Sequence, residues 1–214
     1  PRNVLPKPLT DPHPPMWVAC GSPSTFEKAA HLGLGVLCFT LGTSDELKPL
    51  IELYKREVQK ADPVGDYVND NVMVTSTMLC LEDGDRARRT LHDARGNYHK
   101  SLLFRYLDTF PRPADIPAWP ELCSQYSMDE FAMASSLGEL PVGDPDDAAR
   151  AVQTWIDVGA DQMCSGMLSN ETPIEIVLEA TELFGREVIP RFDQDPIHRS
   201  TRLRDAQLTP DAPS

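Results

Sequence analysis

A short cluster of small and hydroxyl-bearing residues follows the apolar run Pro15–Cys20, and its members are Gly21, Ser22, Ser24 and Thr25. A helix is predicted to begin within it, either at Ser22 with Pro23 in the first helical position or at Ser24 as part of a capping box. Either start leaves backbone N–H groups without intrahelical partners beside the hydroxyls, where the helix dipole favours an anion. The pattern therefore predicts either a phosphate site or plain helix capping, and the carboxylate of Glu27 in the first turn would weaken anion binding.

The elements that position this cluster are short apolar runs, each followed by a helix-like stretch. The four runs are Pro15–Cys20, Gly35–Phe39, Val72–Leu81 and Asp161–Met167. Strands that alternate with helices predict an α/β fold with a parallel sheet. Four such units are half of an eight-stranded (β/α)8 barrel, and half a barrel has two open edges and an uncovered core. We therefore expect a second half barrel to complete this one.

Helix signals and two irregular segments complete the predicted order of elements. Helix starts are expected at Thr43, at Asp144 and at Thr172, and a long helix is expected over Asp83–Tyr106. The excursion 109–141 carries enough apolar surface to cover a pocket, so we interpret it as a lid, with a packing or dimer contact as the alternative. The tail 193–214 is charged and rich in proline, which predicts an extended or disordered segment.

The composition of these 214 residues argues against several kinds of binding partner and cellular location. The formal net charge of −13 argues against nucleic acid and against anionic membrane surfaces as partners. No apolar run has the length of a membrane span and no signal-peptide pattern is present, which favours a cytoplasmic protein. The chain begins at Pro1 without an initiator Met, as we expect of a fragment or a processed chain.

The cysteine and histidine patterns predict no metal centre. Five cysteines without a CxxC pair favour buried, reduced thiols over disulfides or zinc, and they are Cys20, Cys38, Cys80, Cys123 and Cys164. Cys20 and Cys164, near strand ends, are the two that a ligand pocket would include. His92 and His99 are seven residues apart, too far for one metal on one helix, and His13 lies alone between prolines. No residue of this chain is assigned a catalytic role.

Three stretches of the sequence resemble one known family. PKPLTDPHPPMWVACGSPSTFEKAAHLGLGVL is similar to the fifth strand–helix unit of the bacterial luciferase-like flavin monooxygenases. VGDPDDAARAVQTWIDVGADQM is similar to the last crossover helix and eighth strand of that family, and ELFGREVIPRF to its final helix. The resemblance covers about residues 6–192 and corresponds to the last four units of the family barrel, so residues 1–192 are expected to form its C-terminal half.

The resemblance implies an enzyme that uses reduced FMN and O2 to oxygenate a small organic substrate. It places the flavin phosphate on Gly21, Ser22, Ser24 and Thr25, although the family often has an acidic residue where this chain has Gly21. The catalytic residues are expected in the missing N-terminal half, which would be a partner or an upstream part of the same chain. A flavin reductase and self-association into a homo-oligomer are further expected partners. The alternatives are an F420-dependent oxidoreductase and a non-catalytic half barrel that serves as an assembly or flavin-binding subunit.

Overall fold

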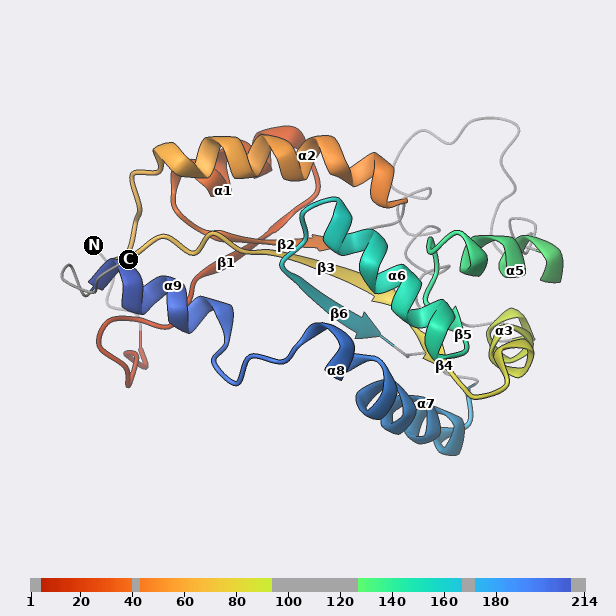
Figure 1. Cartoon of the computed structure of the whole chain (residues 1–214). Coiled ribbons are helices and arrows are strands. Elements are labelled where there is room, and N and C mark those ends of the chain that lie inside the picture. Colours follow the sequence, from red (N-terminus) through yellow and green to blue (C-terminus); the bar gives the residue numbers. More distant parts are fainter. Residues whose placement is uncertain (1–4, 40–42, 94–126, 167–171, 209–214) are drawn as a thin grey trace.

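Four parallel strands form the main sheet of the computed structural model, which describes residues 5–39, 43–93, 127–166 and 172–208. The strands are β1 (Trp17–Cys20), β2 (Gly35–Phe39), β3 (Val72–Thr77) and β6 (Gln162–Gly166). They lie in the order β1-β2-β3-β6, so β1 and β6 are the edge strands (Figure 1). The register pairs Cys20 with Cys38 and Thr75 with Cys164. The sheet confirms the α/β class and the partial barrel.

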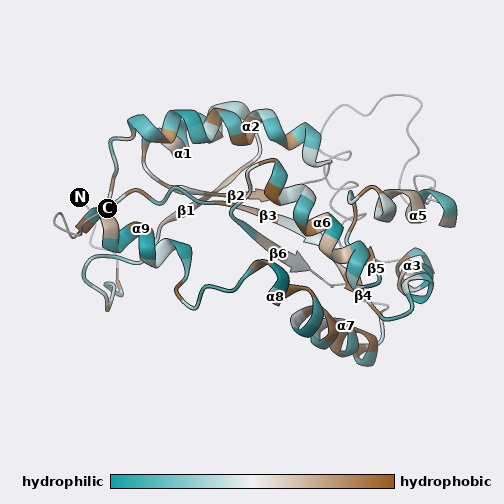
Figure 2. Ribbon diagram, in the orientation of Figure 1, coloured by the Kyte–Doolittle hydropathy of each residue, from teal (hydrophilic) through white to brown (hydrophobic). Residues whose placement is uncertain are grey.

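Helices connect and cover these strands. They are α1 (Pro23–His31), α2 (Ser44–Glu57), the short 3-10 helix η1 (Val58–Lys60), α3 (Gly84–Asp93), α5 (Met128–Ser136), α6 (Pro145–Asp157), α7 (Ile174–Glu187), α8 (Ile189–Phe192) and α9 (Arg199–Leu208). Figure 1 shows α1 and α2 side by side on one face of the sheet. The outward surface of α2 is largely hydrophilic, as expected of a helix that covers a sheet, and α9 is hydrophilic as well (Figure 2).

The core forms on the helix-covered face of the sheet. Val36, Val72 and Val74 are fully buried there against Phe26 of α1 and Tyr54 of α2. Because successive side chains of a strand point to opposite faces, the residues between them face the other way. Those residues are less buried: Leu37, Met73 and Thr75 are half-buried, and Ala19 and Cys164 are exposed. The second face of the sheet is thus incompletely covered by the described part of the chain.

An ion cluster ties α2 to the N-terminal ends of β3 and β6. Lys55 Nζ donates to Asp70 Oδ1 and to Asp161 Oδ2, both at 2.7 Å. The same Asp161 oxygen accepts a hydrogen bond from the backbone N–H of Val72 at 2.8 Å. Asp161 is therefore a shared acceptor that fixes where β3 begins relative to β6.

The expectation of a single strand over Val72–Leu81 is wrong. β3 ends at Thr77, and Leu79–Cys80 form a separate strand, β4, which pairs in parallel with β5 (Val142–Gly143). The hydrogen-bond partner changes within two residues, because the N–H of Met78 donates to Gly166 O and the N–H of Leu79 donates to Pro141 O, each at 3.1 Å. One continuous segment, interrupted only by the hydroxyls of Thr75, Ser76 and Thr77, thus contributes a strand to each of two sheets.

The tail is also corrected, since α9 makes it helical over Arg199–Leu208 rather than extended or disordered. Polar contacts order it: Arg202 donates to both carboxylate oxygens of Asp195 at 2.6 Å. Gln207 accepts from the backbone N–H of Val68 at 2.8 Å and donates to its carbonyl at 2.9 Å. A helix held in this way has no apolar stripe, which is why its sequence pattern does not predict it.

Other predicted boundaries differ by smaller amounts. Helix α2 has Thr43 as its N-cap and α6 has Asp144, both as expected, while α7 starts at Ile174 after Pro173. The expected helix 83–106 is present as α3, and residues 94–106 lie outside the described part of the chain. Residues 109–126 of the predicted lid also lie outside it, and residues 127–141 contain α5.

Candidate functional site

The cluster after β1 caps helix α1, and the start at Ser22 with Pro23 in the first helical position is the one adopted. The Thr25 hydroxyl organises this turn. Its Oγ1 accepts from the backbone N–H of Ser22 at 3.1 Å and of Gly21 at 3.3 Å, and it donates to Ser22 O at 2.7 Å. The alternative start at Ser24 is wrong, and the first turn consequently holds no acidic residue. The expected weakening of an anion site by Glu27 in the first turn loses its basis.

Three hydroxyls converge at this helix N-terminus. Ser22 Oγ lies 3.2 Å from both Ser24 Oγ and Thr25 Oγ1. Ser24 and Thr25 are exposed, and a Cβ added to Gly21 would meet no atom within 4 Å. Hydroxyl groups and N–H groups at a helix N-terminus are the donors that bind a phosphate. The loop is open to a ligand and has the donor chemistry that a flavin phosphate requires.

The C-terminal ends of the four strands lie at the same end of the sheet, where this loop is found (Figure 1). β3 and β6 bring Thr77 and Cys164 to that rim, and Thr75 Oγ1 donates to Cys38 O at 3.0 Å. The described rim segments, residues 20–25, 75–77 and 164–166, contain no His, Lys, Arg, Asp or Glu. The polar side chains of these segments are therefore hydroxyls and thiols.

A family model for luciferase-like monooxygenases matches residues 2–162. The chain belongs to this family. A search of curated proteins finds no match to the chain.

Solved structures show the same fold at low sequence identity. The monooxygenase RslO1 of Streptomyces bottropensis is 20% identical with a TM-score of 0.64, and the match covers 88% of this chain and 51% of that one. The oxygenating constituent of 3,6-diketocamphane monooxygenase from Pseudomonas putida, solved with FMN, is 17% identical with a TM-score of 0.59 over 86% and 50% of the two chains. The F420-dependent tetrahydromethanopterin reductase of Methanopyrus kandleri is 16% identical with a TM-score of 0.50 over 84% and 51%. This luciferase-like chain thus spans about half the length of each of the three.

The buried thiols of this family member stay in their protonated form. Burial raises the pKa of Cys38 to about 12 and that of Cys80 to about 11. Burial also raises the pKa of Cys20, beside the loop, although its contact with Thr25 acts in the opposite direction. These three thiols are therefore poor nucleophiles, as expected of structural cysteines.

The remaining candidates of the luciferase-like chain have structural partners or lie elsewhere. His13 stacks on Tyr67, with ring centroids 5.0 Å apart, and its Nε2 accepts from the backbone N–H of Asp66 at 2.9 Å. His99 and Cys123 lie outside the described residues. Within the described ranges, no group of three His, Cys, Asp or Glu side chains is placed to hold a metal. The helices of those ranges are all too short or too polar to cross a membrane.

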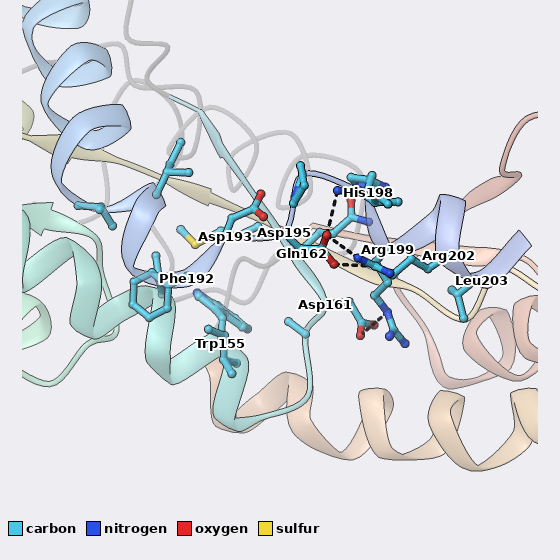
Figure 3. A pocket seen from close by; sticks show the side chains of 18 of the residues that line it. Trp155, Asp161, Gln162, Phe192, Asp193, Asp195, His198, Arg199, Arg202 and Leu203 are labelled. Carbon is cyan, nitrogen blue, oxygen red and sulfur yellow. Dashed lines mark hydrogen bonds and ion pairs between the residues drawn. The ribbon is translucent and has the colours of Figure 1, made fainter. Parts of the chain in front are cut away.

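A cavity of about 960 Å³ lies away from the loop, and nothing in the sequence pattern predicts it (Figure 3). Its wall includes Asp161 and Gln162, where β6 begins, so it lies toward the N-terminal end of the sheet. Helices α6, α7 and α8 and the tail supply most of the rest of the wall. The stretch ELFGREVIPRF, which contains Phe184 and Phe192, is predicted from the sequence only to form a final helix.

Proposed function

We propose that this chain is the C-terminal half of an FMN-dependent monooxygenase and binds the flavin phosphate through Gly21, Ser22, Ser24 and Thr25. The observation that carries the proposal is the convergence of three hydroxyls at the N-terminus of α1, directly after edge strand β1. The fold shared with an FMN-bound oxygenase supports it. The exposure of the loop and the absence of an acidic residue in its first turn are what a dianion requires.

Reduced FMN would supply the reaction with O2 that oxygenates a small organic substrate. The residues of this chain would bind and orient the flavin. Ser22 Oγ and Ser24 Oγ donate to phosphate oxygens, and the helix dipole adds favourable charge. The apolar Leu37 and Met73, on the second face of the sheet, exclude water from the barrel interior once that face is covered.

The partner that this function needs is the N-terminal half of the barrel, carried on the same chain or on a separate one. Edge strands β1 and β6 offer parallel pairing to it on either side of the sheet. The catalytic residues would come from that half, because a barrel draws its site from the loops of several strands. A flavin reductase that supplies reduced FMN, homo-oligomerisation and a cytoplasmic location complete the proposal; the free thiols Cys38 and Cys80 fit a reducing compartment.

Two alternative functions are distinguished by which flavin the loop accepts. An F420-dependent oxidoreductase has support from the fold shared with the Methanopyrus kandleri reductase. A non-catalytic half barrel, acting as an assembly subunit, is the second alternative. Each alternative predicts a result that differs from that of the proposed function in the same binding experiment.

The experiment is a titration of the chain with FMN, with riboflavin and with F420, followed by flavin fluorescence. FMN and riboflavin share the isoalloxazine ring and differ in the phosphate, so their ratio isolates the contribution of the loop. We expect FMN to bind at least about tenfold more tightly than riboflavin, the scale of a charge-assisted hydrogen bond. Preference for F420 would favour the oxidoreductase, and failure of all three to bind would leave the assembly subunit.

A further inference from the structure

The cavity of about 960 Å³ lies between α6, α8 and the tail, at the opposite end of the strands from the phosphate loop. Its wall is apolar in part and charged in part: Trp155 of α6 and Phe192 of α8 lie on one side of the view, and Arg199 and Arg202 of the tail lie on the other (Figure 3). The volume is that of a pocket for a small molecule, and such pockets are mostly apolar with a few polar groups. The cavity thus has the size, and its wall the chemistry, of a site for a small molecule.

The charged groups around this cavity disfavour a charged ligand. Arg202 is already paired with Asp195 through two hydrogen bonds of 2.6 Å, and Arg199 Nε lies 3.0 Å from Asp161 Oδ1. Asp193 also lines the cavity, and Lys55 Nζ lies 2.7 Å from Asp161 Oδ2, so three carboxylates are balanced by three cations. An anion or a cation would have to compete with these existing ion pairs. An uncharged molecule fits best.

The polar groups in the wall favour a ligand that accepts hydrogen bonds. Trp155 Nε1 and Gln162 Nε2 are buried and have no partner, and they are two of the four such side-chain atoms in the described residues. Both belong to residues that line the cavity, so a ligand with an acceptor there would supply the partner that they lack. Both unpaired groups are N–H donors.

We propose that this cavity binds an uncharged, largely apolar molecule that carries a hydrogen-bond acceptor such as a carbonyl group. The ligand packs against Trp155 and Phe192 and takes hydrogen bonds from the unpaired donors. The site is separate from the phosphate loop and does not depend on flavin binding. The tail forms one of its walls, so the ligand also contacts the segment that holds α9 in place.

Three probes of matched size test the ligand class: 2-acetylnaphthalene, 2-ethylnaphthalene and 2-naphthoate. Their binding to the chain is measured by equilibrium dialysis, which needs no tryptophan signal. We expect saturable binding of 2-acetylnaphthalene, about 5–10-fold weaker binding of 2-ethylnaphthalene, which has no acceptor, and the weakest binding for 2-naphthoate, which is an anion. Equal binding of the acetyl and ethyl probes, tightest binding of the naphthoate, or no saturable binding at all would overturn the proposal.

Two substitutions locate the probe within the structure. Ala206→Trp adds bulk to the cavity from an exposed position on α9, and it should weaken 2-acetylnaphthalene at least tenfold. Leu208→Trp adds the same side chain on the same helix outside the cavity wall and should leave binding unchanged. Trp155→Phe keeps the aromatic surface and removes one of the donors, so the acetyl probe should lose part of its advantage over the ethyl probe. Unaltered binding in Ala206→Trp would place the probe elsewhere, whatever the result for FMN.

Discussion

The Thr25 hydroxyl lies across the first turn of α1 and accepts the backbone N–H of Ser22 at 3.1 Å. The same oxygen donates to the Ser22 carbonyl at 2.7 Å, so one side chain satisfies both the donor and the acceptor of its partner. This reciprocal contact sets the direction in which the Ser22 and Ser24 hydroxyls point. The capping and phosphate-binding interpretations of the loop are therefore not exclusive, because the cap arranges the donors.

Replacing Thr25 with Val should destabilise the protein through the loss of this cap. Valine keeps the shape and removes the oxygen, which leaves the N–H groups of Gly21 and Ser22 without their acceptor. We expect a loss of about 1 kcal/mol in the free energy of unfolding, the usual cost of removing a cap. Urea unfolding measures it, and Thr25→Ser, which retains the oxygen, serves as the control. A loss in Thr25→Ser together with unchanged stability in Thr25→Val would show that the methyl group, not the hydroxyl, matters.

Ser22→Ala should weaken FMN and leave riboflavin unaffected. The substitution removes a hydroxyl that is proposed to donate to the phosphate, and a charge-assisted hydrogen bond contributes about 1–2 kcal/mol, or about 5–30-fold in Kd. Ser136→Ala is the matched control, because its hydroxyl donates to Met133 O within α5, away from the loop. An FMN affinity unchanged in Ser22→Ala would remove Ser22 from the phosphate site.

Local signals predict some parts of this fold well and fail where distant segments decide. β2 is found where its apolar run predicts it, because one short run fills one strand. The run Val72–Leu81 gives no sign of the break after Thr77, since that break depends on Gly166 and Pro141, far along the chain. At the site, Ser22 and Ser24 both carry capping patterns, and only the position of the Thr25 hydroxyl separates them.

Non-local contacts also explain why the cavity and the tail were not predicted. α9 is held to the rest of the chain by the amide of Gln207 on the backbone of Val68, which no periodic pattern encodes. Parts of α6, α8 and the tail line the cavity. The sequence of each of these elements, taken alone, has the pattern of an ordinary helix or linker. The hydrophobic pattern of a segment indicates which of its faces is buried and which is exposed to solvent. It does not indicate which segments together enclose a cavity.

Lys55→Met should be strongly destabilising. Asp70 and Asp161 are 21% and 15% exposed, so the substitution leaves two largely buried carboxylates close together, Asp70 without its cation and Asp161 with Arg199 alone. We expect a loss of about 2–3 kcal/mol in the free energy of unfolding, somewhat less than for a fully buried pair. Lys60→Met is the control, because Lys60 is 64% exposed in its pair with Glu57 and its loss should change stability little. Equal effects of the two substitutions in urea unfolding would contradict the role of the cluster.

The contribution of Asp147 to stability should depend on pH. Burial acts to raise the pKa of Asp147, but hydrogen bonds from Arg150 and Arg88, each at 2.8 Å, outweigh it and lower the pKa below its usual value. A carboxyl whose folded pKa is depressed stabilises the protein above the unfolded pKa of about 3.9 and loses that contribution as the pH falls through the folded pKa. Asp147→Asn should therefore cost about 1–2 kcal/mol at pH 7 and nothing at a pH below the folded value.

Urea unfolding of both proteins between pH 2 and pH 7 measures this difference. Asp146→Asn is the neighbouring control, since Asp146 is 75% exposed in its pair with Arg191 and its replacement should have a small effect at every pH. A difference for Asp147→Asn that stays constant down to pH 2 would show that the charge of Asp147 is not what stabilises α6.

The exposed and the buried cysteines should differ strongly in their reactivity toward an alkylating reagent. Cys164 is exposed on the second face of β6, whereas Cys38 and Cys80 are fully buried with pKa values raised to about 12 and about 11. Because the thiolate is the reactive form, iodoacetamide at pH 8 should label Cys164 in the native chain and reach Cys38 and Cys80 only after unfolding. Peptide mass spectrometry reads each site. Protection of Cys164 when a completing half barrel is added would indicate that the second face of the sheet becomes covered, and labelling at an unchanged rate would argue against that mode of assembly.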